Sequence, residues 1–204
     1  MYSKKTTLLM GFHGCDRSVC DSVINGDSLK PSLNSYDWLG NGIYFWEADP
    51  QRAMEWAVQA SKRKSSSVKD PAVLGAVIDL GNCFDLMNRQ SIPILESGYK
   101  WLKEIQEAKN LPLPENRNVK GNYDFLYRDL DCAVIQKVHE ATYKRPELGI
   151  APYDSVRGLF LEGSQVYEGS SFKEKTHVQL CIINPNCIKG YFLPRELDKC
   201  YPVP

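Results

Sequence analysis

Long apolar runs are absent from this 204-residue sequence. No stretch approaches the roughly 18 consecutive apolar residues that a membrane-spanning helix needs. The first residues, "MYSKKTTLLMGFHG", hold two lysines and a short apolar run, but no long hydrophobic region and no small-residue cleavage site. We therefore predict no signal peptide and expect a cytoplasmic protein without a membrane partner.

An excess of charge of either sign is also missing. The chain has 25 Lys and Arg residues and 25 Asp and Glu residues, so its formal net charge is zero. This balance disfavours a protein that is held to nucleic acid mainly by bulk charge. A local basic patch or a transient nucleic-acid substrate remains compatible with it.

Metal-ligand spacing is lacking as well. The seven cysteines form no CxxC pair, and the three histidines, His13, His139 and His177, lie far apart in the sequence. A zinc site needs clustered Cys and His residues, so no metal is expected. An odd number of cysteines, most of them in apolar surroundings, indicates a reducing compartment.

The hydrophobic pattern predicts one α+β domain across residues 1–204. The helix that begins near Asp49 has the strongest start signal, because Asp49 can cap it and Pro50 fits its first turn. We expect strands at about residues 6–14, 43–46, 73–80, 156–163, 164–169, 175–185 and 187–194, and helices at about residues 16–26, 49–64, 96–110 and 123–144.

Three short segments place polar or aromatic groups near strand ends. In "FHG", His13 can exchange a hydrogen bond with a ligand, and Gly14 lets a ligand approach the backbone; the alternative is a core histidine beside a turn. In "GNGIYF", Tyr44 can stack on a planar ring, with Trp56 of the next helix opposite it; the alternative is core packing for both.

The third segment is "KTHVQLCII". In a strand, His177, Gln179 and Cys181 share one face. A buried glutamine needs hydrogen-bond partners, so Gln179 indicates either a site or the solvent side of an edge strand.

In this order, "FHG", "LGNGIYFWEADPQRAMEWA" and "QLCIINPNCIKGYF" resemble segments of the ADP-ribosyltransferases of the diphtheria-toxin and poly(ADP-ribose) polymerase type. The resemblance covers Leu8 to Trp56 and Arg157 to Phe192. These enzymes have a His, Tyr, Glu triad on the strand ends of a split sheet. The resemblance therefore implies an ADP-ribosyltransferase-like split β-sheet core with flanking helices.

The resemblance also implies roles for individual residues. His13 would bind the ribose and adenosine side of NAD, Gly14 would hold the nicotinamide carboxamide through its backbone, and Tyr44 would stack on the nicotinamide ring. Trp56 lies one residue out of step with the family's second stacking aromatic. Arg157 would meet an NAD phosphate, or would simply pair with an acid.

Gln179 departs from the family, which has a glutamate at this position. A glutamine retains hydrogen bonds but loses a charge that stabilises the transition state. Three interpretations follow: the acceptor is already a good nucleophile, with His177 assisting as a base; a nearby carboxylate substitutes; or only ligand binding survives. The candidate carboxylates are Glu162, Glu168 and Glu174.

The expected activity is transfer of ADP-ribose from NAD to a macromolecular acceptor (RNA, DNA or protein), with release of nicotinamide and no metal. Residues 162–176, which include Tyr167, Phe172, Lys173 and Lys175, would form an acceptor-recognition loop or a plain surface loop. The small domain resembles a bacterial toxin or phage-defence effector, which implies an antitoxin partner. The alternatives are an NAD glycohydrolase, an inactive NAD-binding or interaction module and, less favoured, an RNA 2′-phosphotransferase.

Overall fold

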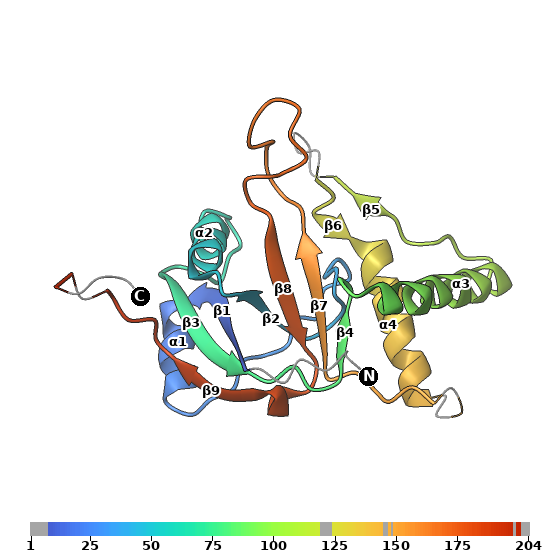
Figure 1. Cartoon of the computed structure of the whole chain (residues 1–204), viewed down its shortest axis with the longest axis horizontal. Coiled ribbons are helices and arrows are strands. Elements are labelled where there is room, and N and C mark those ends of the chain that lie inside the picture. The colour runs from blue at the N-terminus through green and yellow to red at the C-terminus, as the bar shows by residue number, and fades with distance from the viewer. Residues whose placement is uncertain (1–7, 119–123, 145–146, 148, 198, 201–204) are drawn as a thin grey trace.

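The computed structural model describes residues 8–118, 124–144, 147, 149–197 and 199–200. Seven of the strands in this part of the chain form one mixed sheet in the order β4-β7-β8-β2-β1-β3-β9 (Figure 1). β4 and β7 are parallel, and the other neighbours in this sheet are antiparallel. The strands are β1 (Leu9–Asp16), β2 (Ile43–Glu47), β3 (Pro71–Ile78), β4 (Cys83–Asp85), β7 (Ser155–Phe160), β8 (His177–Ile182) and β9 (Ile188–Phe192).

Four α-helices are described: α1 (Arg17–Ile24), α2 (Pro50–Ser61), α3 (Ile92–Ala108) and α4 (Asp129–Lys144). Two start signals are confirmed, because the side chains of Asp16 and Asp49 cap α1 and α2. α3 begins four residues earlier than expected. Within the described ranges, no helix has the length and apolar character that crossing a membrane would require.

Two further predicted elements differ from the structure. The segment expected as a strand at residues 164–169 is a loop with one isolated bridge, Gln165 to Lys173. Gly163 and Gly169 at its ends have φ of 93° and 79°, which interrupts an extended strand. The helix expected from residue 123 begins at Asp129, because Tyr127–Arg128 (β6) pairs with Asn116–Arg117 (β5) instead; residue 123 itself lies outside the described residues.

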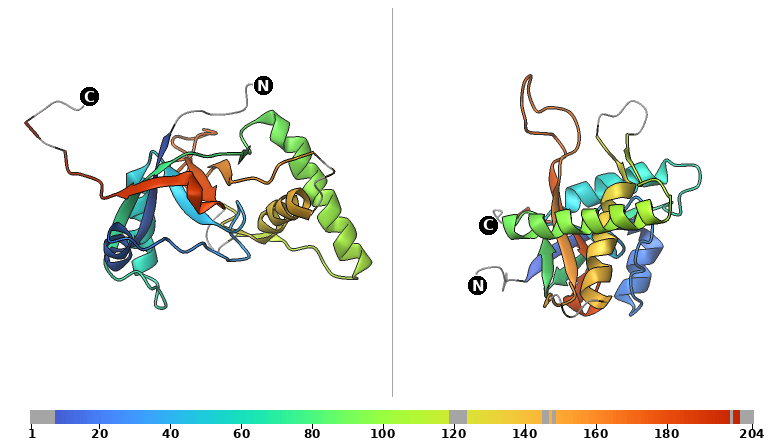
Figure 2. Two further views of the ribbon diagram at one scale, coloured as in Figure 1. Left: turned by 90° about the horizontal axis from the view of Figure 1, so that it is seen from below. Right: turned by 90° about the vertical axis from the view of Figure 1, so that its right-hand side faces the viewer.

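The helices lie on different parts of the sheet. Figures 1 and 2 show α1 and α2 beside β1 and β3, and α3 and α4 beside β4 and β7. The predicted alternation in β8 is confirmed, since Leu180 and Ile182 pack in the core beneath α1, whereas Cys181 packs in the core that includes α4. At Gly98, α3 approaches α4 so closely that an added Cβ would lie 2.6 Å from Val138.

The junction between β1 and β2 matters most for the site. These strands pair only at Gly11 with Glu47 and at Phe12 with Trp46, and the sheet opens beyond this point. The sheet is nevertheless continuous, whereas the resemblance implied a split core. The α+β class is confirmed, and the specific ADP-ribosyltransferase fold stays a prediction.

Candidate functional site

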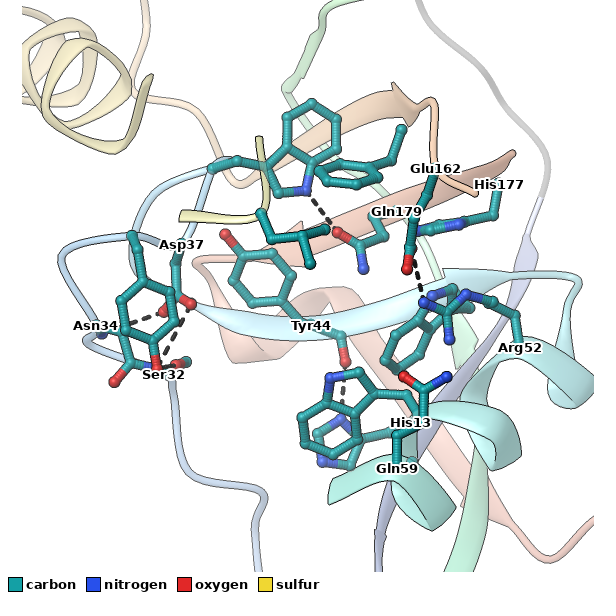
Figure 3. A pocket seen from close by; sticks show the side chains of 18 of the residues that line it. His13, Ser32, Asn34, Asp37, Tyr44, Arg52, Gln59, Glu162, His177 and Gln179 are labelled. Carbon is teal, nitrogen blue, oxygen red and sulfur yellow. Dashed lines mark hydrogen bonds and ion pairs between the residues drawn. The ribbon is translucent and has the colours of Figure 1, made fainter. Parts of the chain in front are cut away.

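A cavity of about 440 Å³ opens on the sheet face that carries α2, next to the β1–β2 junction. Its volume lies in the range of about 300–1,000 Å³ that is usual for small-molecule sites. It gathers residues that are far apart in the sequence, from β1, β2, α2, β8 and the loop before β2 (Figure 3). The sequence candidates on its wall are His13, Gly14, Tyr44, Trp56, His177 and Gln179, and Glu162 joins them.

His13 lies one residue beyond the last β1–β2 pair. Its Nδ1 is 2.8 Å from the carbonyl oxygen of Tyr44, so the ring bridges the two strands where their pairing has stopped. Because a carbonyl only accepts, Nδ1 is the protonated nitrogen and Nε2 retains a lone pair. Burial lowers the pKa of His13, partly offset by the bond to Tyr44, so the ring is neutral near pH 7.

Tyr44 fixes the loop before β2. Its hydroxyl donates to the carbonyl of Gly40 at 2.8 Å and accepts from the amide of Leu39 at 3.0 Å. Burial raises the pKa of this phenol well above its usual value, so it stays protonated. With the hydroxyl held at the loop, the ring lines the cavity near Gln179, and the backbone carbonyl of Tyr44 meets His13 (Figure 3).

Gln179 has a fixed amide orientation. Its Oε1 accepts a hydrogen bond from Trp38 Nε1 at 2.5 Å. The indole nitrogen can only donate, so the amide oxygen must face Trp38 and the NH₂ group faces elsewhere. Trp38 is held in turn by Arg128, whose guanidinium lies 5.2 Å from the indole centroid. Gln179 therefore offers mainly hydrogen-bond donors to the cavity. The sequence did not indicate this orientation of the amide.

Helix α2 packs very closely on β1. A Cβ on Gly14 would lie 2.2 Å from the carbonyl oxygen of Ala53, so Gly14 is required by packing whatever it does for a ligand. Trp56 lies 5.9 Å from Trp46 between ring centroids and lines the cavity. The predicted stacking partner of Tyr44 is thus on the cavity wall, packed against another indole.

A buried ion pair lies at the β7–β8 end of the cavity. Arg52 Nη2 of α2 is 2.7 Å from Glu162 Oε2, and the side chains are 8% and 12% exposed. The Arg52 guanidinium also lies 5.9 Å from the Trp46 ring centroid. Its Nε and Nη1 groups are buried and have no hydrogen-bond partner among the described residues.

His177 lies beside this pair. Its Nδ1 is 2.6 Å from the carbonyl of Lys175, its ring stacks on Phe160, and burial lowers its pKa. Its Nε2 is buried and unpartnered among the described residues. An acceptor would reach this nitrogen only after neighbouring side chains shift, so its role as a base stays a prediction.

Arg157 and two of the candidate carboxylates lie elsewhere. Arg157 does not line the cavity, because Glu47 binds it at 2.5 and 2.8 Å and Asp85 at 3.3 Å. Of the two roles considered for Arg157, its position fits pairing with acidic side chains. Glu168 and Glu174 are exposed on the loop between β7 and β8 and do not line the cavity either.

Other cavity residues escaped the sequence interpretation. Lys30 and Arg63 are exposed cations on the rim, and Asp37 lies across Tyr44 from Glu162 (Figure 3). Trp38 falls within the "DWLGNGIYF" segment but had no assigned role. In the described residues, no group of three or more His, Cys, Asp or Glu side chains is arranged to hold a metal ion.

A relative aligns over most of the chain. An uncharacterized protein of Methanocaldococcus jannaschii is 26% identical over 208 residues, which cover 92% of this chain and 89% of that protein. No family model matches the chain. No solved structure matches it either.

Proposed function

We propose that this protein transfers ADP-ribose from NAD to a macromolecular acceptor and releases nicotinamide. One observation supports this most: His13, Tyr44 and Gln179 come from β1, β2 and β8 and line one cavity where the sheet opens. The same three positions carry the resemblance in the sequence. The fold class alone would not favour this activity over others.

In the proposed complex, the nicotinamide ring stacks on Tyr44 and the carboxamide approaches the backbone at Gly14. His13 Nε2 accepts a hydrogen bond from a ribose hydroxyl, because the Nδ1–H of the ring already donates to the Tyr44 carbonyl oxygen. The diphosphate extends toward Lys30 and Arg63, which replace Arg157 as the cations on this path. Base–aromatic stacking supplies roughly 1–3 kcal/mol of such binding.

In the proposed reaction, the bond between ribose C1′ and the nicotinamide nitrogen breaks. Its electron pair moves to that nitrogen and cancels its positive charge. The positive charge that develops is shared by C1′ and the ribose ring oxygen. A lone pair on a nitrogen or oxygen of the acceptor then bonds to C1′, and the acceptor loses one proton.

The test uses NAD that is labelled in its adenylate part and measures both the nicotinamide released and the label transferred. Separate reactions contain no acceptor, total RNA, DNA or cell protein. We expect the wild-type chain to release nicotinamide and to label one of these pools. Both release and labelling should be lost in His13→Ala and Tyr44→Ala. Tyr143→Ala is the matched control, because Tyr143 is 61% exposed and lies outside the cavity.

The outcomes separate the alternatives. Release without labelling of any pool contradicts the transferase and supports an NAD glycohydrolase. If no nicotinamide is released under any condition, the result contradicts an enzyme that cleaves NAD and supports an NAD-binding or interaction module. An antitoxin partner stays a prediction that this experiment does not address.

A further inference from the structure

We propose that Glu162 is the acceptor-side carboxylate of this site: its free oxygen takes the hydrogen bond of the incoming nucleophile and orients it toward ribose C1′. This inference rests on the proposed function. It assigns to Glu162, from the end of β7, a task that Gln179 is poorly placed to perform.

The polar atoms on the cavity wall differ in what they offer a nucleophile. Trp38 occupies the amide oxygen of Gln179, which leaves its NH₂ group for the cavity. A nucleophilic N–H or O–H needs an acceptor, and an NH₂ group supplies only donors. Arg52 binds Glu162 at Oε2, and Oε1 has no hydrogen-bond partner among the described residues. Oε1 is therefore an open acceptor on this wall, whereas the unpartnered Nε2 of His177 is buried.

Glu162 also differs in position from the other candidate carboxylates. Glu168 and Glu174 are exposed on the outer loop and do not reach the cavity wall. Asp37 lines the cavity, but it accepts from Asn34 at 3.1 Å and lies beyond Tyr44 (Figure 3). Figure 3 also shows Glu162 extending to Arg52 on the wall that carries His177 and Gln179.

A contribution to stability explains the ion pair of Arg52 and Glu162 poorly. Burying both charges costs several kcal/mol in desolvation, and a buried pair is often no more stable than apolar residues of similar volume. Arg52 also leaves two buried nitrogen atoms, Nε and Nη1, without partners among the described residues. Such incompletely satisfied groups need an explanation, and a functional site is one. Arg52 keeps the carboxylate oriented while Oε1 stays open.

In the proposed step, Glu162 orients the acceptor and receives its proton. The acceptor N–H or O–H donates to Glu162 Oε1, and its lone pair points toward C1′. When the glycosidic electron pair leaves with nicotinamide, the acceptor lone pair forms the new bond to C1′. The proton leaves by way of Oε1 to water.

The test compares two outputs of one reaction: nicotinamide released and label transferred to the pool that the wild-type chain labels among total RNA, DNA and cell protein. In Glu162→Gln, the amide oxygen stays with Arg52, and an NH₂ group replaces Oε1. Losing a hydrogen bond to a charged group should lower transfer about 10- to 100-fold. Release to water should change by less than about threefold, since NAD contacts persist.

Two kinds of variant keep the result interpretable. Glu104→Gln, at an exposed position of α3 outside the cavity, is the matched control and should leave the ratio of transfer to release unchanged. If Glu162→Gln does not fold, the neutral pair Arg52→Gln/Glu162→Gln removes the uncompensated charge and should show the same loss of transfer.

The overturning results are distinct. An unchanged transfer-to-release ratio in folded Glu162→Gln overturns the role of Glu162 and leaves the proposed function standing. Release by the wild-type chain without labelling of any pool overturns an acceptor-side role. Absence of release by the wild-type chain overturns the proposed function itself.

Discussion

Trp38 Nε1 donates a 2.5 Å hydrogen bond to Gln179 Oε1 across 141 residues of sequence. The bond determines which end of the Gln179 amide meets the cavity, because the indole N–H can only donate. A glutamine that is free to rotate would present either its oxygen or its NH₂ group. Here the tertiary structure selects one of them.

Replacing Trp38 tests this relationship. In Trp38→Phe the amide is no longer oriented, and we expect nicotinamide release to fall about 2- to 10-fold, the equivalent of one neutral hydrogen bond. Adding Trp38→Phe to Gln179→Leu should cost little more than Gln179→Leu alone, because the two residues act through one bond. Trp101→Phe, on α3 and outside the cavity, is the control. Fully additive losses would contradict the coupling.

Arg157 should matter for stability and not for NAD. Arg157→Met removes the guanidinium that Glu47 and Asp85 bind, and breaking such a buried pair costs about 3–5 kcal/mol of unfolding free energy. Urea denaturation measures this cost, and calorimetric titration of the folded variant should give wild-type NAD affinity. The exposed pair of Arg17 and Asp70 supplies the control Arg17→Met, with a loss below about 1 kcal/mol. A specific loss of NAD affinity in Arg157→Met would restore the phosphate role.

A side chain at position 14 should destabilise the protein. In Gly14→Ala the new Cβ meets the Ala53 carbonyl, so α2 must move, and we expect about 1–3 kcal/mol of destabilisation. Gly190→Ala in β9 is the matched control, because no atom lies within 4 Å of its added Cβ. Thermal unfolding of both variants measures the difference. Equal stability would mean that the close contact between α2 and β1 relaxes without cost.

His139 of α4 predicts a pH dependence of stability. Burial lowers its pKa from 6.5 to about 4, and neither ring nitrogen has a hydrogen-bond partner among the described residues. The folded state therefore favours the neutral ring. This contribution is complete above pH 6.5, and it is lost as the pH falls from 6.5 toward 4, by at most about 1.4 kcal/mol per pH unit.

The measurement compares the wild-type chain with His139→Leu in urea at pH 7.5 and pH 5. His13 and His177, whose pKa values are also lowered, contribute to both chains over the same range. The difference between the chains isolates His139, and the wild-type chain should lose about 2 kcal/mol more than the variant on acidification. Parallel losses in both chains would show that His139 protonates without cost in the folded state.

The sequence predicted much of the local structure because the signals are local. Asp16 and Asp49 cap helices within a few residues of themselves, and the alternation of His177, Gln179 and Cys181 follows from the period of a strand. The grouping of His13, Tyr44 and Gln179 was also predicted, although it came from the resemblance and not from spacing.

Local propensity misjudged residues 164–169, whose strand-like "SQVYEG" is bounded by two glycines with positive φ. It also missed the start of α4, because Tyr127 and Arg128, which the helical pattern includes, form strand β6. The glycine backbone conformation overrode the side-chain pattern at residues 164–169, and pairing with Asn116–Arg117 overrode it at Tyr127–Arg128.

The sequence by itself determined which residues can form helices and strands, and which side chains share a strand face. Tertiary structure decided which polar groups face the cavity. Arg157 is held by Glu47, and Glu162 by Arg52, each across 110 residues, so partner choice depended on how the sheet brings distant strands and helices together. A charged group in a folded chain takes the nearest opposite charge that the fold supplies, and only the assembled sheet defines that distance.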